Sequence, residues 1–452
     1  MTTHEVRLRS RQVVSPVRAG RLLRLAIAAG LGVVVFMWWN GGTGPYLRTP
    51  GAVMTSFGEL TGMVGGFLVC IQILLIARVP WMEHAVGMDR LVAWHRTVGA
   101  SVLFLIVTHV VAMIFGQQLI ATQAPWAATV AVLTSYPDML TALIGTLLFF
   151  AIGISSARVP RQKLPYELWY WLHVSAYIAV FLTFLHQISG GVHFDSNPIN
   201  RAAWIMLYLA TASAVLTWRV VLPITAAWRH RLRVVAVVDE GGGITSVWLG
   251  GKRLHELGAV AGQFFLFRFL TFGHLLTAHP FSLSRVPDND FMRISVGSLG
   301  NHTAKFPHLR VGTVVFAEGP FGVFTAAHST SGKILLVAGG AGIGPIRALA
   351  EEFVRRRRDV TVIYRSSDVA SIGLDNELRA LGRIRVTTVV GSRSQLAYDP
   401  LGVSSLRTLV PDALEREAYI CGPNGMADTV EGSLSHLGLP RRMIHREELS
   451  IA

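Results

Sequence analysis

Four histidines lie in strongly apolar stretches of the first half of the chain, where an ionisable side chain is costly and usually functional. His95 and His109 occupy one stretch, and His173 and His186 occupy another. On an ideal helix His95 and His109 are about 21 Å apart and within about 40° of one face, so one helix can present two imidazoles at two depths. His173 and His186 miss a common face by about 140°, so a local helix distortion or different side-chain directions must make up the difference.

These spacings predict two histidine pairs, His95 with His173 at one level and His109 with His186 at the other. Two facing imidazoles supply the axial nitrogens of a six-coordinate, low-spin haem iron, and two such haems would carry an electron across the hydrocarbon core. The alternative role, an interhelical hydrogen bond, explains one histidine better than four in matched positions. His84 and His193 are predicted to lie in solvated loops.

Six apolar stretches are long enough to cross a bilayer and must position these histidines. They lie near residues 22–40, 53–77, 91–115, 137–157, 166–188 and 202–222. The 452 residues include 51% hydrophobic but only 15% charged residues, which excludes a wholly soluble enzyme and a disordered chain. The first stretch is interpreted as an uncleaved span and not as a signal peptide.

The net charge of +14 is interpreted as a membrane-orientation signal and not as a sign of nucleic-acid binding. Arginine and lysine cluster before the first span, in alternate loops and after the sixth span, so the positive-inside rule places both termini in the cytoplasm. We expect a multi-pass protein of a cell membrane. The two cysteines, Cys70 and Cys421, exclude a disulfide framework and a four-cysteine iron–sulfur cluster.

After Pro223, short alternating runs separated by glycine-rich turns predict a small antiparallel β-barrel to about residue 328. From Gly332 the pattern changes to strand, glycine turn and helix. Here a buried strand ends at Gly339 and Gly340, and Gly342, Gly344 and Pro345 open a helix whose N–H groups could meet a pyrophosphate. A second strand follows, which favours a dinucleotide site. The final strand of the sheet is predicted in "EAYICGP", ending at Cys421.

The motifs "HPFSLS" (His279 to Ser284), "SLGNHT" (Ser298 to Thr303), "EGPFG" (Glu318 to Gly322), "GGAGIGP" (Gly339 to Pro345) and "CGPNGM" (Cys421 to Met426) resemble those of the NADPH oxidase and ferric reductase superfamily. The paired histidines resemble its haem-binding transmembrane domain, and the similarity runs from about Leu22. It implies a multidomain chain. The parts are a cytoplasmic segment (1–21), a six-helix transmembrane bundle (22–224), an antiparallel β-barrel FAD domain (225–328) and an α/β Rossmann-like nucleotide-binding domain (329–452).

By this resemblance, the flavin ring, ribityl and phosphate region is held by His279, Pro280, Phe281, Ser282, Leu283 and Ser284, and the flavin pyrophosphate is met by Gly300 and Thr303. The nicotinamide dinucleotide's pyrophosphate is held by Gly339, Gly340, Gly342, Gly344 and Pro345, and the nicotinamide lies beside Cys421, Gly422 and Pro423. Cys421 is expected to be a small strand-end residue and not a nucleophile. Arg365 and Ser366 follow the second strand and favour NADPH over NADH. Leu449 stands where the family usually has an aromatic residue.

The expected activity is that of a membrane flavocytochrome b with FAD and two b haems. NADPH, or NADH, would reduce the flavin, and electrons would leave one at a time through the His95–His173 haem and then the His109–His186 haem. No general acid or base is expected in the membrane. The acceptor stays open between dioxygen, a ferric chelate and an extracytoplasmic protein or quinone. The alternatives are a tethered NAD(P)H:flavin reductase and a redox-sensing membrane protein without haem.

Overall fold

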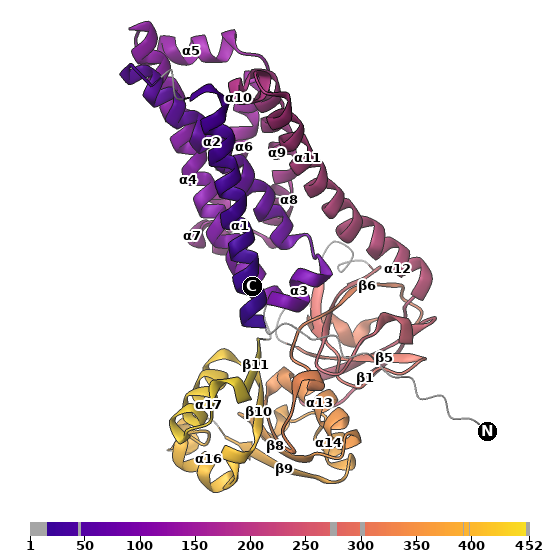
Figure 1. Ribbon diagram of the computed structural model, residues 1–452. Helices are drawn as coiled ribbons and strands as arrows, with labels where there is room; N and C mark the ends of the chain where they lie inside the picture. Colours follow the sequence, from indigo (N-terminus) through magenta and orange to yellow (C-terminus); the bar gives the residue numbers. More distant parts are fainter. Residues whose placement is uncertain are drawn as a thin grey trace, which may run out of the picture. The chain divides into compact units, whose positions relative to one another are not determined.

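The computed structural model describes residues 16–43, 47–271, 278–298, 303–391, 393–396 and 398–448. The chain divides into two compact units, Met1–Val220 and Val221–Ala452. The first unit is helical, and the second contains three β-sheets with helices (Figure 1).

The first unit is a bundle of apolar helices. Six of the described helical stretches are long and apolar enough to cross a membrane: Gly20–Gly41, Pro50–Ile76, Arg90–Ala121, Met139–Ser156, Glu167–Gly190 and Pro198–His230. The six predicted spans are therefore confirmed. The helices are α1 (Pro16–Trp38), α2 (Pro50–Ile76), α3 (Pro80–Val86), α4 (Met88–Ala121), α5 (Pro125–Ser135), α6 (Met139–Ser156), α7 (Arg158–Lys163), α8 (Tyr166–Val174), α9 (Ala176–Gly190), α10 (Val192–Asp195) and α11 (Pro198–Val215), with π-helical turns η1 (Trp39–Thr43) and η3 (Leu216–Val221).

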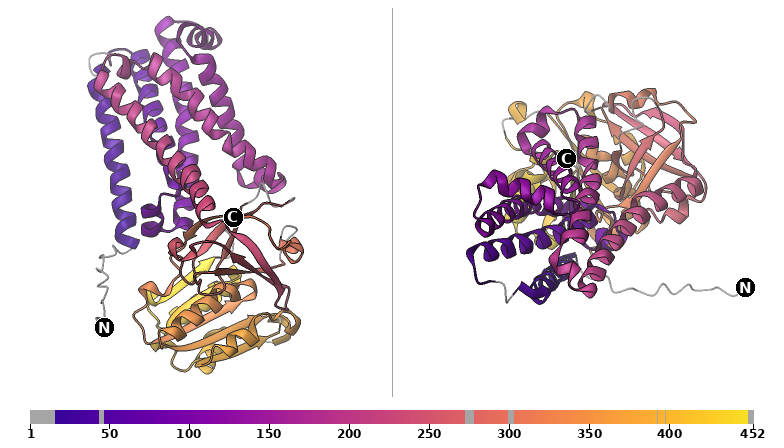
Figure 2. Two further views of the ribbon diagram at one scale, coloured as in Figure 1. Left: turned by 90° about the vertical axis from the view of Figure 1, so that its right-hand side faces the viewer. Right: turned by 90° about the horizontal axis from the view of Figure 1, so that it is seen from above.

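Small residues allow α2 and α4 to pack closely along their lengths (Figures 1 and 2). A Cβ atom at Gly58 would lie 2.9 Å from Sδ of Met113, and one at Gly116 would lie 2.3 Å from Oγ1 of Thr55. Helices in a membrane associate through such close packing, because lipid is as apolar as the helix surface. The glycines of α2 therefore bring its backbone against the helix that carries His95 and His109.

The fifth span is interrupted between its two histidines. Helix α8 ends at Val174, α9 begins at Ala176, and Ser175 between them has φ −61° and ψ −7°. The Ser175 hydroxyl donates to the carbonyl of Leu172 at 2.6 Å, which supports the local turn. The structure thus has a local helix distortion between His173 and His186, one of the two possibilities that their spacing allows.

The second unit begins with α12 (Leu222–His230) and continues as an antiparallel β-domain around one core. Its sheets have the orders β1–β2–β5 and β4–β3–β6. The strands are β1 (Arg233–Asp239), β2 (Ile244–Gly250), β3 (Phe264–Phe269), β4 (His279–Ser282), β5 (Phe291–Gly297) and β6 (Val315–Phe321), with 3-10 turns η4 (Leu254–Leu257), η5 (Thr303–His308) and η6 (Ala326–His328).

Alternate residues of β3 fill the core of this domain. The side chains of Phe265, Phe267 and Phe269 are fully buried, as expected from the period of two along a strand. The two sheets are joined by isolated bridges, Arg233–Val314 and Leu283–Ile294. The antiparallel β-domain is confirmed, and its sheets meet at these bridges and not along continuous ladders.

The remainder of the unit is a parallel five-stranded sheet of order β11–β10–β7–β8–β9 with helices on both faces (Figure 1). Its strands are β7 (Lys333–Gly339), β8 (Asp359–Ser366), β9 (Ile384–Val390), β10 (Glu417–Gly422) and β11 (Ile444–Glu448). The helices are α13 (Ile343–Arg355), α14 (Asp375–Ala380), α15 (Arg393–Leu396), α16 (Val403–Leu409) and α17 (Asn424–Leu437), with turns η7 (Gly340–Gly342), η8 (Val369–Ser371), η9 (Ala413–Glu415) and η10 (Arg441–Met443).

The buried strand β7 has an apolar side chain on both faces. Leu336 packs into the cluster that includes residues of α13, whereas Leu335 and Val337 pack into the cluster that includes residues of α17. A strand that is covered on both faces has a continuous run of apolar residues in its sequence, as "KILLVAG" has. The prediction that the sheet ends with "EAYICGP" is wrong, because β11 follows as a parallel edge strand beside β10.

Candidate functional site

The four membrane histidines form the two predicted pairs. The ring centroids of His95 and His173 are 6.0 Å apart, and those of His109 and His186 are 6.4 Å apart. Helix α4 supplies one member of each pair, and the other members come from α8 and α9 on either side of the break at Ser175. Each pair therefore faces across one gap between helices.

Backbone carbonyls of α2 set the protonation of the two α4 histidines. Nδ1 of His95 lies 3.0 Å from the carbonyl oxygen of Gln72, and Nδ1 of His109 lies 2.8 Å from that of Gly58. A carbonyl oxygen can only accept, so each Nδ1 carries the proton and donates it. In the neutral ring, Nε2 then keeps its lone pair, which is the state a metal-binding histidine needs.

The pair His95–His173 has polar and aromatic neighbours. Nδ1 of His173 lies 3.2 Å from Oγ of Ser156, which also accepts from the indole N–H of Trp169. The Trp169 ring stacks on the His173 ring with centroids 5.0 Å apart. These contacts restrict the rotation of the His173 side chain, as hydrogen-bonded neighbours do for metal-binding histidines.

The pair His109–His186 lines a cavity of about 380 Å³, which also touches Gly62, Gly65 and Gly66 of α2. A Cβ atom at Gly62 would lie 2.7 Å from Nδ1 of His109. Nδ1 of His186 is buried and has no hydrogen-bond partner among the described residues. The cavity, the glycines and the unpaired imidazole nitrogen are features that a bound planar group would explain.

The same cavity is lined by polar residues that the sequence did not reveal. Nε2 of His193 lies 3.0 Å from Oε2 of Glu59, and the His193 side chain is buried. The prediction that His193 is solvated is therefore wrong, because a carboxylate from α2 pairs with it. The side chain of His84 lies outside the described residues. Oε1 of Gln187 accepts from the indole of Trp204 at 2.8 Å and from the hydroxyl of Tyr208 at 3.2 Å.

The two pairs fit a bis-imidazole haem. With an Fe–N distance of about 2 Å, and with the ring centre about 1.1 Å behind the nitrogen, the two centroids of such a pair would be about 6 Å apart. Both observed separations are close to this value. Among the described residues, histidine, cysteine, aspartate and glutamate form no group of three or more with metal-ligand spacing. The candidate donors therefore occur as pairs.

The residues of "HPFSLS" lie on β4 and directly after it. His279, Pro280, Phe281 and Ser282 form the strand, Leu283 is buried and bridges to Ile294, and Ser284 is fully buried. The His279 and Phe281 rings are stacked with centroids 5.9 Å apart, and both contact the Phe306 ring edge-on. His279 and Phe306 are buried, so Phe281 is the partly exposed ring of this group on which a flavin could pack.

Arg293 holds Ser284 in place and was not indicated by any sequence motif. Its Nε donates to Oγ of Ser284 at 3.0 Å, and its Nη1 lies 2.7 Å from Oε2 of Glu377. Glu377 also pairs with Arg347 of α13 at 2.7 Å. The network thus joins the β-domain to the first helix of the parallel sheet within the second unit. Thr303 begins η5, and Gly300 lies outside the described residues.

The glycine loop lies at the carboxyl edge of the parallel sheet. Strand β7 ends at Gly339, the turn η7 covers Gly340–Gly342, and α13 includes Gly344 and Pro345. From β7 the chain continues to β8 and β9 on one side, and it returns to β10 on the other side. The carboxyl edge between β7 and β10 is therefore a topological switch point, where ligands of such sheets bind.

The end of β10 lies directly against this loop. Cys421 is paired with Ala338 in the sheet, and a Cβ atom at Gly342 would lie 2.2 Å from the carbonyl oxygen of Cys421. Gly422 is the last residue of β10 and Pro423 precedes α17. Burial raises the pKa of the Cys421 thiol well above its usual range, and the Glu447 carboxylate adds to this effect. Cys421 therefore remains a neutral thiol, consistent with a packing role.

Arg365 and Ser366 end β8, at the same edge of the sheet. The Arg365 guanidinium donates to the carbonyl of Val389 at 3.2 Å and also to those of Ser366 and Gly391. The Ser366 hydroxyl donates to the carbonyl of Asp368 at 2.8 Å. The two side chains predicted to bind a 2′-phosphate, Arg365 and Ser366, therefore donate hydrogen bonds to backbone carbonyl oxygens in this structure. Leu449 lies outside the described residues.

The first unit matches a known domain family. Residues 61–184 match the family described as ferric reductase like transmembrane component. This segment includes His95, His109 and His173 and most of helices α2 to α9, and it ends two residues before His186.

The chain is also similar to several reductases. A flavohemoprotein of Xylella fastidiosa is 25% identical over 333 residues, which are 68% of this chain and 83% of that protein. Flavohemoprotein A of Dictyostelium discoideum is 28% identical over 185 residues, which are 37% of this chain and 45% of that protein. An NADPH oxidoreductase of Mycobacterium tuberculosis is 27% identical over 146 residues, which are 32% of this chain and 38% of that protein. The chain thus spans less than half of the length of the last two relatives.

Among solved structures, the ferredoxin reductase in carbazole 1,9a-dioxygenase is 21% identical, with a TM-score of 0.42. The match covers 49% of this chain and 69% of that chain.

The chain therefore joins helices that match a ferric reductase like transmembrane component to a second unit built on three β-sheets, and it is similar in sequence to flavohemoproteins. The matched family and the six long apolar helices indicate a multi-pass membrane protein.

Proposed function

We propose that this protein is a membrane flavocytochrome b that passes electrons from cytoplasmic NADPH, through FAD and two haems, to an extracytoplasmic acceptor. The acceptor is dioxygen, giving superoxide, or a ferric chelate. The observation that carries the proposal is the pair of imidazole separations, 6.0 Å and 6.4 Å, in two levels of one helical bundle. When bound, FAD takes a hydride and releases single electrons, and each haem carries one electron at a time.

The chain's own residues would hold these groups. His95 with His173, and His109 with His186, would hold one haem each through their imidazole nitrogens, and the carbonyls of Gln72 and Gly58 keep Nε2 of the α4 histidines unprotonated. A ligand bound through Nε2 becomes a better electron donor when its Nδ1–H is hydrogen-bonded, so these carbonyls also tune the site.

The reductase unit would bind its two nucleotides at neighbouring positions. The strand residues His279 to Ser282, with buried Leu283 and Ser284, would meet FAD, and Thr303 and Gly300 would meet its pyrophosphate. The N–H groups of the Gly339–Gly344 turn, at the N-terminus of α13, would hold the pyrophosphate of NADPH. Pro345 continues that helix, and Cys421, Gly422 and Pro423 would flank the nicotinamide.

The haem content tests the proposal directly. The pyridine haemochrome of the purified, haem-loaded chain is expected to show two b haems per polypeptide. His109→Ala is expected to lose one of them and to stop reduction of an external acceptor, while NADPH still reduces the flavin. A chain without haem would contradict the proposal and would favour a tethered flavin reductase or a redox-sensing protein.

The acceptor is tested by following NADPH consumption in oxygen, and then with a ferric chelate under anaerobic conditions. Turnover in only one condition identifies the acceptor class. If a chain with two haems supports neither reaction, both named acceptors are wrong and an extracytoplasmic protein or quinone takes their place.

NADPH preference depends on Arg365. Its guanidinium would have to leave the carbonyl oxygens of Val389 and Gly391 to reach a 2′-phosphate. Arg365→Ala is expected to raise the KM for NADPH about tenfold and to leave that for NADH unchanged, because a charge-assisted pair is lost only with NADPH. Equal changes for both nucleotides would assign Arg365 a structural role.

A further inference from the structure

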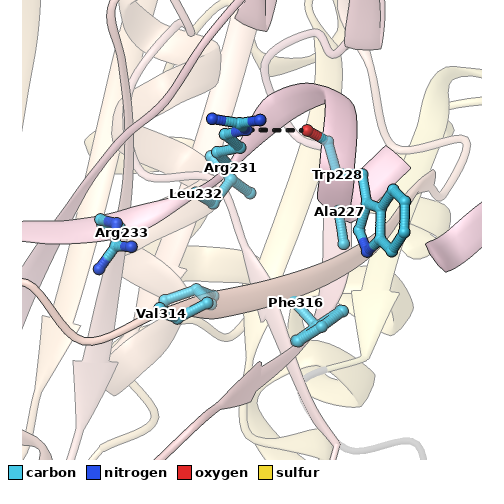
Figure 3. Close-up of a pocket in the computed structure, with 8 residues that line it drawn as sticks. Ala227, Trp228, Arg231, Leu232, Arg233, Val314 and Phe316 are labelled. Atoms are coloured by element: carbon cyan, nitrogen blue, oxygen red, sulfur yellow. Dashed lines mark hydrogen bonds between the residues drawn. The ribbon is translucent and has the colours of Figure 1, made fainter. Parts of the chain in front are cut away.

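A pocket of about 390 Å³ lies in the second unit, where helix α12 gives way to strand β1 (Figure 3). It is separate from the glycine loop and from the flavin-binding strand residues. Its lining residues are Ala227, Trp228, Arg231, Leu232, Arg233, Val314, Val315 and Phe316. Pockets of roughly 300–1,000 Å³ are the usual size for small-molecule sites.

The local chain geometry brings three functional side chains to this pocket. Arg231 ends α12 in the left-handed conformation, with φ 47° and ψ 48°, and its N–H donates to the carbonyl of Ala227 at 3.0 Å. The chain therefore turns from helix to strand within two residues. As a result, Trp228 of α12 and Arg233 of β1 line the same pocket as Arg231. Val314, which directly precedes β6, and Phe316 of β6 line it as well (Figure 3).

The two pocket arginines have no carboxylate partner among the described residues. Nε of Arg231 donates to the carbonyl of Trp228 at 3.3 Å, and Nη1 of Arg233 donates to that of Gly312 at 3.0 Å. Each guanidinium has five N–H donors, so both keep donors for a ligand. The nearby Arg229 differs, because its Nε lies 2.6 Å from Oε2 of Glu256. The pocket therefore concentrates positive charge that no carboxylate of the described residues neutralises.

The remaining lining is apolar and includes an unusually exposed indole. Trp228 is 77% exposed, and Val314, Phe316 and Leu232 form an apolar surface beside the arginines. The sixth candidate membrane span runs from Pro198 to His230, so Trp228 lies in its last turn. Tryptophan is enriched near the ends of membrane spans, because one end of its ring contacts lipid and the other meets water.

We propose that this pocket binds an anionic phospholipid. Arg231 and Arg233 hold the headgroup phosphate, because guanidinium groups match the geometry of phosphate oxygens. Trp228, Val314 and Phe316 contact the glycerol and the first acyl carbons. A free phosphate ion would share the contacts to the arginines, but it would leave the apolar wall unused. The site is additional to the proposed electron path and does not depend on it.

Native mass spectrometry of the full chain tests the site. The protein is released from micelles that contain equal amounts of phosphatidylglycerol and phosphatidylcholine, and the retained lipids are identified. The wild type is expected to retain phosphatidylglycerol selectively, and Arg231→Gln/Arg233→Gln is expected to retain about tenfold less, since each cation near the surface contributes to anionic-lipid binding. Arg231→Gln and Arg233→Gln are also tested singly, and Arg229→Gln is the matched control for each, because it removes one charge from an arginine that already pairs with Glu256.

A second measurement separates a lipid from a free ion. Brominated phosphatidylglycerol is expected to quench tryptophan fluorescence more in the wild type than in Trp228→Phe, and inorganic phosphate is expected not to reverse the difference. Reversal by inorganic phosphate would make the site a simple anion site. Equal phosphatidylglycerol retention by the wild type and the double variant, with FAD content unchanged, would overturn the proposal.

Discussion

At the scale of single residues, Arg416 organises the start of strand β10. Its side chain is fully buried, Nε lies 2.8 Å from Oδ1 of Asp412, and Nη2 lies 2.8 Å from Oδ2 of Asp359. The hydrogen bond from Arg416 lowers the pKa of Asp412 from its usual 3.8 to about 2. A buried cation with such partners is costly to disturb, because removal of one partner leaves the charge unpaired.

This pair makes the stability of the second unit sensitive to acid. The Asp412 carboxylate stabilises the fold fully above pH 3.8, and this contribution is lost as pH falls towards about 2. Asp412→Asn is expected to cost about 1–2 kcal/mol at neutral pH and to remove this part of the pH dependence. The temperature at which bound FAD is released, read by its fluorescence, measures the effect.

Glu415→Gln is the control for that experiment. Glu415 is exposed and pairs only with Lys333 among the described residues, at 2.5 Å. Its loss is expected to change the release temperature little, because exposed ion pairs contribute little. An acid profile of Asp412→Asn identical to the wild type would contradict the assignment.

Some of the site residues could be predicted from the sequence, and others could not. The four span histidines could be singled out because the cost of an ionisable group in an apolar stretch is a local property. His193 could not, because its partner Glu59 is 134 residues away in the chain. Arg293 could not be predicted either, because it belongs to no recognised motif. It contacts Ser284 and Glu377, which come together only in the folded protein.

At the scale of elements, the contact between α2 and α4 predicts the effect of a single methyl group. Gly62→Ala would place a Cβ atom 2.7 Å from Nδ1 of His109. The variant is expected to lose about 1–3 kcal/mol through overpacking and to bind less haem at the His109 level. Haem content per polypeptide measures this.

Gly32→Ala is the matched control, because a Cβ atom at Gly32 of α1 has no neighbour within 4 Å among the described residues. Full haem content in both variants would show that His109 can move without loss of function.

The turn between β7 and α13 gives a second prediction. Gly342→Ala would place a Cβ atom 2.2 Å from the carbonyl oxygen of Cys421, which is backbone and cannot rotate away. NADPH binding is expected to weaken at least about tenfold, because the two loops must separate. Gly425→Ala in α17 is the control, since a Cβ atom there meets nothing within 4 Å of the described chain. Equal KM values for NADPH in the two variants would refute this role of Gly342.

Elements differ in how clearly the sequence specifies them. The phase of His173 and His186 allowed two possibilities, a local helix distortion or different side-chain directions, and the structure has an interruption at Ser175. The edge strand β11 was missed because its residues, "IHREE", have only one apolar side chain and no alternation. Its pairing with the buried strand β10 decides its conformation, so tertiary context overrides the local pattern.

At the scale of the whole molecule, the distribution of basic loops predicts that both termini face the cytoplasm. A fluorescent protein fused to the C-terminus is expected to fold and fluoresce in cells, whereas alkaline phosphatase at the same position is expected to be inactive. The reverse pattern would place the nucleotide sites outside and would exclude cytoplasmic NADPH as the donor. Alkaline phosphatase fused after the first span, near Arg48, is the positive control.

The contacts between carbonyls of α2 and histidines of α4 constrain the number of residues between the two levels in each helix. Fourteen residues separate Gly58 from Gln72, and fourteen separate His95 from His109. Two antiparallel helices can satisfy both contacts only while these intervals stay equal. One added residue in α4 would turn the far histidine by about 100° and shift it by about 1.5 Å. One residue added to each helix would restore the equal intervals but would still turn both contacting groups. Insertions and deletions between the two levels should therefore be tolerated only when they add or remove nearly a whole number of helical turns in both helices.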